Sequence, residues 1–343
     1  MRPKDKTSTP RHGPHSSLSG THDGHHIIII IIMDLPLEYQ SPNGTVRWTK
    51  FGSGPPLVFN HGTPWSSFVW RDIAQALSST HTVFLWDMPG YGRSDKYDGQ
   101  DVSLGAQGAL FAALLAHWTT TTTGVDVAAT TTTTTPSPSF VVVAHDFGGA
   151  VALRARLLHG ARYRALALVD PVALAPWGSP FFRLVGAHGH VFAQLPGALH
   201  AALVKEYISS ASYAGLQAAT LEELARPWCS GEGDDDDDAA ATAGGQVASG
   251  VGQAAFYRQI QQADERFTDE VEARYGEVTA DGTPAAVIWG VEDRWVPLER
   301  GRALATRMGV PLREIEGAGH LVQLDRPAQL TGALMEFLGS LPA

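Results

Sequence analysis

Five residues, His145-Asp146-Phe147-Gly148-Gly149, constrain the fold of this chain more than any other stretch. They follow an apolar, β-branched run at residues 140–144, typical of a buried strand, and precede a segment with helical spacing at residues 150–159. A strand, a tight turn of small residues and a helix together present the side chain in the turn at the carboxyl end of the strand. The sequence therefore predicts that Asp146 faces a ligand at the edge of a sheet.

Apolar runs typical of strands recur along the chain, and helical spacing lies between most of them. The runs are residues 57–60, 83–86, 140–144, 165–169, 286–289 and 312–315, and the helical segments are 107–117, 150–159, 298–308 and 327–338. Continuously apolar strands that alternate with helices indicate an α/β fold with a mostly parallel sheet and helices on both faces. The long interval from residue 172 to residue 282 lacks such a run and predicts an inserted helical cap.

The chain is expected to divide into four parts. Residues 1–32, rich in Ser, Thr, Pro, Gly and His, are predicted to be a disordered tail. Residues 33–171 form the first part of the core, residues 172–282 the cap, and residues 283–343 the second part of the core. Two low-complexity segments, threonine-rich 119–138 and partly acidic 230–252, are predicted to be surface loops without a function of their own.

Composition narrows the class of protein. The net charge is −10, with no basic patch, which argues against a nucleic-acid partner. Cys229 is the only cysteine, so an internal disulfide is impossible and buried packing is the expected role. The longest apolar run, residues 27–33, is far shorter than a membrane span, and we expect a soluble, cytoplasmic protein.

Four groups that carry reactive or donor side chains follow predicted strands or precede the last helix. They are His61-Gly62-Thr63-Pro64, Asp146, Asp293 and His320. Ligands of parallel sheets bind at the carboxyl ends of the strands, so these groups are expected to meet in one site. Their order along the chain, with a candidate nucleophile, then an acid, then a histidine, is the order found in α/β-hydrolases.

Over about residues 36–118, 139–230 and 253–343 the chain resembles the α/β-hydrolase superfamily. An aspartate at the nucleophile position, where serine is usual, resembles the branch that holds epoxide hydrolases, haloalkane dehalogenases and haloacetate dehalogenases. Residues 61–71, HGTPWSSFVWR, are close to the haloalkane dehalogenase pattern, and residues 90–95, GYGRSD, match a turn common to the superfamily. The resemblance implies an α/β-hydrolase fold with an inserted helical cap.

The chemistry of an aspartate nucleophile follows from its charge. Asp146 is ionised near neutral pH, so it needs no base before it attacks a tetrahedral carbon and forms an alkyl ester. His320 is then free to deprotonate the water that hydrolyses the ester, and Asp293 orients the imidazole. The resemblance implies an oxyanion hole made by the N–H groups of Thr63 and Phe147. This chemistry needs a small organic substrate and water, with no cofactor and no metal ion.

A second carboxylate competes for the role of the acid. Asp170 ends the predicted strand 165–169, and some haloalkane dehalogenases carry the acid at this position. Asp293 is preferred because Gly-x-x-Asp after the penultimate strand is the commoner arrangement, which leaves Asp170 as a structural or substitute carboxylate.

The leaving group decides which further side chains the site needs. A halide leaves as a stable anion and needs only weak donors, often indole N–H groups. Haloalkane dehalogenases usually have Trp directly after the nucleophile and often Asn at the position of Thr63, whereas this chain has Phe147 and Thr63. Trp65 and Trp177 are the candidate replacement donors.

An epoxide leaves as an alkoxide and needs a proton from an acid such as tyrosine. Tyr257, in Ala255-Phe256-Tyr257-Arg258, resembles the cap tyrosine of epoxide hydrolases, and Tyr207 or Tyr213 could supply a second. The arginines that hold the carboxylate in haloacetate dehalogenases are absent after Asp146. The leading hypothesis is an epoxide-hydrolase-like enzyme. The alternatives are a haloalkane dehalogenase and a non-hydrolytic protein that binds a small ligand, which the complete set of three residues argues against.

Overall fold

The computed structural model describes residues 34–123, 140–229 and 251–342. Its centre is an eight-stranded sheet with the order β1-β2-β4-β3-β5-β6-β7-β8. The strands are β1 Leu37–Ser41, β2 Gly44–Gly52, β3 Pro56–Asn60, β4 Thr82–Trp86, β5 Val141–His145, β6 Ala165–Val169, β7 Ala285–Gly290 and β8 Leu312–Ile315. The predicted α/β fold with a mostly parallel sheet is confirmed.

The six strands that the sequence predicted form the parallel part of the sheet, from β4 to β8 in its order. β5, β6 and β7 are buried along their whole length, because helices cover both faces, and their continuous apolar sequences reflect this. The antiparallel strands β1 and β2 were not predicted. β1 lies at the edge of the sheet and carries mostly exposed or half-buried residues, so it lacks an apolar run.

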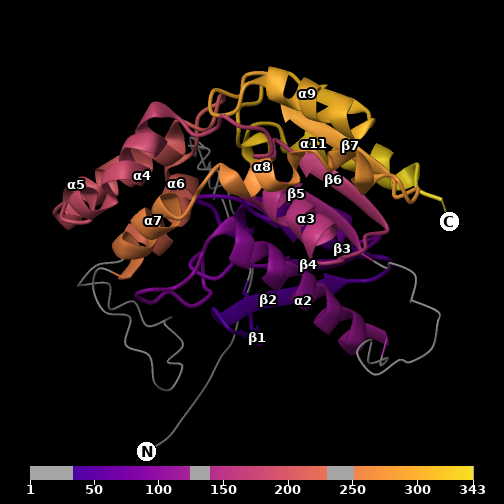
Figure 1. Cartoon of the computed structure of the whole chain (residues 1–343), viewed down its shortest axis with the longest axis horizontal. Helices are drawn as coiled ribbons and strands as arrows, with labels where there is room; N and C mark the ends of the chain where they lie inside the picture. The colour runs from indigo at the N-terminus through magenta and orange to yellow at the C-terminus, as the bar shows by residue number, and fades with distance from the viewer. Residues whose placement is uncertain (1–33, 124–139, 230–250, 343) are drawn as a thin grey trace, which may run out of the picture. The chain divides into compact units, whose positions relative to one another are not determined.

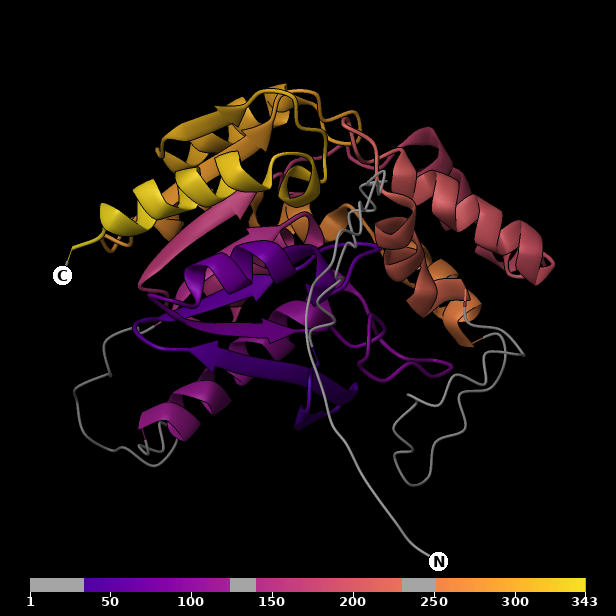
Figure 2. The same cartoon turned by 180° about the vertical axis from the view of Figure 1, so that it is seen from behind.

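Helices pack on both faces of the sheet. α2 (Leu104–Thr123), α3 (Phe147–Leu158) and α9 (Leu298–Met308) cover the face turned to the viewer in Figure 1. α1 (Arg71–Leu77) and α11 (Pro327–Gly339) cover the other face, as Figure 2 shows. Short helices complete the core: η1 Ser67–Trp70, α8 Arg266–Glu272, η2 Tyr275–Val278 and α10 Val322–Asp325.

Four of the helices between β6 and β7 occupy most of the interval that the sequence predicts to be an inserted cap, and these four helices are called the cap below. They are α4 Pro180–Phe192, α5 Gly197–Ser209, α6 Ala218–Cys229 and α7 Val251–Gln261, and they lie together to one side of the sheet in Figure 1. α4 packs against α7, and α5 packs against α6. The described residues of this interval are therefore helical with connecting loops and contain no strand, as the sequence predicted.

The predicted low-complexity loops need one correction. Residues 119–123 belong to the last turns of α2, where the hydroxyls of Thr119 and Thr120 bond to carbonyl oxygens four residues earlier. Residues 251–252 likewise begin α7. These bonds satisfy the threonine hydroxyls within the helix, which the apolar residues earlier in α2 anchor. The predicted tail 1–32 and the remaining parts of both loops lie outside the described residues.

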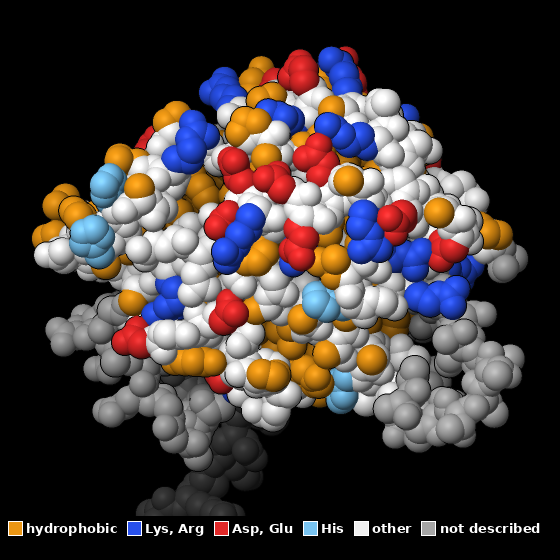
Figure 3. All heavy atoms as spheres, viewed as in Figure 1, with side chains coloured by type: hydrophobic (Ala, Val, Ile, Leu, Met, Phe, Trp, Pro, Cys, Tyr) orange, Lys and Arg blue, Asp and Glu red, His pale blue; other side chains and the backbone are white. Residues whose placement is uncertain are grey.

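The surface mixes charges of both signs. On the face in Figure 3, Lys and Arg side chains alternate with Asp and Glu side chains, as they do in ion pairs such as Arg302–Glu314 and Arg307–Glu272. Within the described ranges, no helix combines the length and the apolar character needed to cross a bilayer.

Candidate active site

Asp146 lies in the turn between β5 and α3 with a left-handed backbone, φ 52°. Aspartate seldom adopts this conformation, and strained residues of this kind concentrate at functional sites. The neighbouring glycines make room for it. A Cβ on Gly62 would lie 2.2 Å from Asp146 Oδ1, and a Cβ on Gly148 would lie 2.4 Å from the carbonyl oxygen of His61. The sequence Gly-Gly after Phe147 is thus a steric requirement of the turn.

Asp146, His320 and Asp293 form one hydrogen-bonded chain. His320 Nε2 lies 3.1 Å from Asp146 Oδ2, and His320 Nδ1 lies 2.7 Å from Asp293 Oδ2. Asp293 Oδ1 accepts the backbone N–H groups of Trp295 and Val296, at 2.7 and 2.9 Å. All three side chains are buried. The three residues that the sequence singled out from separate segments are therefore in direct contact.

The protonation states of this chain follow from the two carboxylates. Burial opposes a charge on His320, but Asp293 and Asp146 outweigh burial and raise the pKa of the imidazole well above 6.5. Burial would raise the pKa of Asp146, but the bond to His320 and its charge lower it below 3.8. The resting site therefore holds an Asp146 carboxylate beside a His320 imidazolium.

Two predicted oxyanion donors adjoin Asp146. The Thr63 N–H donates to Asp146 Oδ1 at 2.6 Å. Phe147 is the first residue of α3, so its N–H belongs to the four N-terminal donors that a helix leaves without an intrahelical partner. A negative charge that develops on an Asp146 oxygen would meet donors already in place.

Asp170 lies behind Asp293 and does not bond to His320. Its Oδ1 accepts the Gly290 N–H at 2.9 Å, while its buried Oδ2 has no hydrogen-bond donor in the described part of the chain. Burial and then the charge of Asp293 raise the pKa of Asp170 well above 3.8. Oxygen and nitrogen atoms of Asp170, Asp293 and His320 lie within 4.8 Å of one another, a spacing that also suits a metal ion. With a proton on it, Asp170 does not repel the neighbouring Asp293 carboxylate. His320 Nδ1 is bonded to Asp293 Oδ2, so this nitrogen is not free to hold a metal ion.

We expect Asp170→Asn to stabilise the protein at neutral pH. A carboxyl with a raised folded pKa binds more protons in the folded state, so the unfolding free energy falls as pH rises between the unfolded and the folded pKa. Asparagine removes this loss and can still accept the Gly290 N–H and donate to Asp293. The melting temperature of the variant should exceed that of the wild type at pH 7, and the difference should close below about pH 4.

The matched control is Asp101→Asn, an Asp-to-Asn change at an exposed position. A difference in melting temperature that stayed constant between pH 4 and pH 8 would contradict a protonated Asp170.

A small cavity opens beside Asp146. Its volume is about 30 Å³, which holds one or two water molecules. The walls are mainly apolar and aromatic and come from the core and the cap: Thr63, Asp146, Phe147, Val172, Trp177, Gly178, Ser179, Phe182, Tyr207, Trp295 and Val296. The site thus combines a buried carboxylate with mainly apolar walls.

The predicted leaving-group residues lie in different places. Tyr257 is a correction, because it does not line the cavity: its hydroxyl donates to His200 Nδ1 at 2.8 Å and its ring packs on Phe192. Tyr207 does line the cavity, and no hydrogen-bond partner for its hydroxyl occurs among the described residues.

The two predicted tryptophans do not present free indole N–H groups to the cavity. Trp177 lines the cavity, but its Nε1–H donates to Thr268 Oγ1 at 3.0 Å. Trp65 is buried against the ring of Trp295 and is not a wall residue. Its own Nε1–H has no partner in the described ranges.

The sequence did not indicate several residues that contact the site. Trp295 stacks on Tyr207, with ring centroids 4.4 Å apart, and on His320, at 5.3 Å. Gln259 Oε1, from the cap, accepts hydrogen bonds from the hydroxyls of Thr63 and Tyr91. The position of Trp295, two residues after Asp293, was the available signal.

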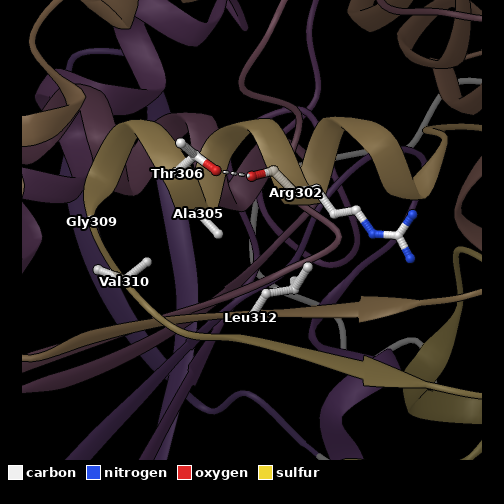
Figure 4. A pocket seen from close by; sticks show the side chains of 6 residues that line it. All are labelled: Arg302, Ala305, Thr306, Gly309, Val310 and Leu312. Carbon is white, nitrogen blue, oxygen red and sulfur yellow. Dashed lines mark hydrogen bonds between the residues drawn. The ribbon is translucent and has the colours of Figure 1, made fainter.

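A wider depression of about 420 Å³ lies elsewhere, between α9 and β8 (Figure 4). Its wall consists of Arg302, Ala305, Thr306, Gly309, Val310 and Leu312. The Arg302 guanidinium is already paired with Glu314 at 2.9 Å. These six residues include no carboxylate, thiol or imidazole, so size alone does not make this depression a reactive site.

Comparison with known proteins agrees with this fold. The model of the family described as "Alpha/beta hydrolase family" matches residues 57–333. The chain belongs to this family. A solved alpha/beta hydrolase fold protein from Burkholderia ambifaria is 41% identical, with a TM-score of 0.75, over 89% of this chain and 98% of that one. Epoxide hydrolase A of Mycobacterium tuberculosis is 26% identical over 90% of this chain and 99% of its own length.

Other members of the alpha/beta hydrolase family match shorter stretches. A haloalkane dehalogenase of Sphingobium indicum is 28% identical over 36% of this chain and 37% of its own length. The pimeloyl-[acyl-carrier protein] methyl ester esterase of Aeromonas salmonicida is 42% identical, but the match spans about a quarter, 24%, of that protein.

Proposed function

We propose that this protein is an Asp-nucleophile hydrolase that opens epoxides of small, apolar molecules. One observation carries the proposal: Asp146, bonded to His320, lines the same cavity as Tyr207, whose hydroxyl has no hydrogen-bond partner within the described part of the chain. This arrangement provides a nucleophile, a base and an acid for one substrate. The full-length similarity to an epoxide hydrolase supports the same assignment.

In the first step, a carboxylate oxygen of Asp146 attacks one carbon of the epoxide and breaks its bond to the ring oxygen. The ring oxygen leaves as an alkoxide and takes the proton of the Tyr207 hydroxyl. Burial, followed by the charge of Asp146, raises the pKa of Tyr207 well above 10, so the hydroxyl holds its proton until a strong base forms beside it. The step yields an ester between Asp146 and the substrate.

In the second step, His320 removes a proton from water, and the water oxygen attacks the carbonyl carbon of the ester. Asp293 stabilises the imidazolium that forms. The negative charge of the tetrahedral intermediate falls on an Asp146 oxygen, beside the N–H groups of Thr63 and Phe147. When the intermediate collapses, the substrate oxygen takes the proton from the His320 imidazolium and a diol leaves. The Asp146 carboxyl then gives up its proton and the Tyr207 phenolate takes one, which regenerates the Asp146 carboxylate and the Tyr207 hydroxyl.

The walls of the cavity bear on the substrate, because core and cap residues such as Phe147, Phe182 and Tyr207 line it. Aromatic and aliphatic walls favour an apolar substituent on the epoxide.

We expect Tyr207→Phe to slow epoxide opening by about a hundredfold to ten-thousandfold, because the alkoxide then lacks its proton donor. The matched control is Tyr257→Phe, which removes a hydroxyl that bonds to His200 outside the cavity. Diol formation from paired terminal epoxides measures the effect. Equal losses in both variants would contradict the role given to Tyr207.

The main alternative is a haloalkane dehalogenase, which the match to the Sphingobium indicum protein favours. A paired assay separates the two, with terminal epoxides and haloalkanes of the same chain length and separate measurement of diol and halide. Halide release without diol would overturn the epoxide assignment. Neither product from a folded sample would favour a ligand-binding protein instead.

A further inference from the structure

One short segment after α5 bonds to the core beside His320. Residues 210–214, here called the docking segment, follow α5 directly. The Trp295 indole N–H donates to Ser210 Oγ at 3.1 Å, and the Leu321 N–H donates to the carbonyl oxygen of Ala211 at 3.2 Å. The segment therefore contacts both the loop that carries Asp293 and the loop that carries His320.

Asp325 is the centre of this attachment. It lies at the end of α10, five residues after His320, and is almost completely buried. From the docking segment its carboxylate accepts the Ser212 hydroxyl and the N–H groups of Tyr213 and Ala214, at 2.8 and 3.2 Å for the two N–H groups. From the other side it accepts the N–H of Gly319 at 2.7 Å. One carboxylate thus joins the cap to the residue that precedes His320.

The fit around Gly319 is tight. A Cβ at this position would lie 2.8 Å from the Ala211 carbonyl oxygen and 2.9 Å from the Tyr213 nitrogen. The loop can approach the docking segment this closely only because residue 319 is glycine.

We propose that Asp325 is a positioning residue that fixes the base, His320, relative to the acid, Tyr207. Tyr207 lies in the last turn of α5, and its carbonyl oxygen accepts the Ser210 hydroxyl at 2.7 Å, at the start of the docking segment. Asp325 acts on His320 through Gly319 and on Tyr207 through the docking segment. This inference rests on the proposed function, which gives Tyr207 a role in the first step and His320 a role in the second.

A carboxylate suits this role and an amide does not. Four donors point at Asp325, and hydrogen bonds to an ionised acceptor are about twice as strong as neutral ones. In the Asp325→Asn variant the side chain would have only one acceptor oxygen, and its NH2 group would face N–H donors. We therefore expect this substitution to break the bonds from Asp325 either to the docking segment or to Gly319, while the size of the side chain changes very little.

The test compares Asp325→Asn with Asp101→Asn, an exposed change of the same chemistry. We expect kcat of Asp325→Asn to fall about a hundredfold, as for a displacement of about 1 Å in a site, while KM changes little because the cavity wall is intact. The pH midpoint of ester hydrolysis should move downward, since a displaced His320 loses part of its bond to Asp293. The other titratable groups around His320, namely Asp146, Asp170 and His145, are unchanged in the variant.

A second readout does not depend on activity. The ring ¹⁵N and ¹H resonances of His320, assigned with His320→Gln, report its bond to Asp293 directly. A shift of these resonances in Asp325→Asn but not in Asp101→Asn supports the positioning role even if no epoxide is hydrolysed, which would separate it from the proposed function. Unchanged resonances together with an unchanged pH midpoint would overturn it.

A milder variant covers the case in which Asp325→Asn does not fold. Ser212→Ala removes one donor to Asp325 and leaves the other three. It should lower kcat by a factor of about 2 to 30, with the same direction of pH shift. A folded Ser212→Ala with wild-type kcat and pH midpoint would contradict the proposal.

Discussion

Asp146→Asn should lower kcat/KM by about a million-fold, the scale seen when a covalent nucleophile is removed. Asparagine matches aspartate in size and keeps an oxygen for the Thr63 N–H, so the turn should survive. It has no negative charge, however, and does not attack a saturated carbon. Turnover of a terminal epoxide, followed by diol formation, measures the effect.

The control for Asp146→Asn is Asp170→Asn, the same change in a carboxyl that is also buried and also follows a strand. Because Asp170 does not line the cavity and makes no hydrogen bond to His320 among the described residues, this variant should keep most of its activity. If Asp146→Asn retained activity comparable to Asp170→Asn, a covalent role for Asp146 would be untenable.

His320→Gln should stop the reaction at the ester. Attack by Asp146 does not require a base, whereas hydrolysis of the ester does, so the two steps respond differently to this change. Loss of a general base costs about a hundredfold to ten-thousandfold in rate. Intact-protein mass spectrometry should show an increase equal to the mass of one substrate molecule, and peptide mapping should place it on Asp146.

The wild-type protein under the same conditions is the reference for this experiment and should show no stable adduct. A substrate that the wild type hydrolyses, but that leaves His320→Gln unmodified, would argue for direct attack by water instead of an ester.

The core of the fold could be predicted because a strand that is buried on both faces has a continuous apolar sequence. β5, β6 and β7 are continuous apolar runs, and each predicted reactive group follows a strand or precedes the last helix. The glycines around Asp146 also indicated a tight turn in the sequence, and the turn has no room for a Cβ at these positions. The antiparallel strands β1 and β2 were missed because partly exposed strands lack a continuous apolar run.

The sequence could not predict which side chains of the cap face the core. Tyr257 and Gln259 are two residues apart on α7, about 200° around the helix axis, so they face in nearly opposite directions. Tyr257 faces His200, whereas Gln259 faces Thr63 and Tyr91. Both side chains are buried, so apolar periodicity alone did not indicate which of the two faces the core.

The choice between Tyr207 and Tyr213 has a similar cause. Tyr207 packs between Phe181 and Trp295 at the cavity, while Tyr213 is about half exposed and lies under the Arg294 guanidinium. The two tyrosines are six residues apart, on either side of the end of α5, and only the position of that helix end separates their roles.

The contact between Asp146 and His320 also sets the order of events. Asp293 and Asp146 together raise the pKa of His320, and an imidazolium cannot act as a base. In the proposed mechanism, formation of the ester removes the charge of Asp146, so the pKa of His320 falls and the imidazolium releases its proton to solvent. The neutral imidazole can then take a proton from water. The enzyme would therefore withhold its base until a substrate is bound covalently, and an empty site would not activate water.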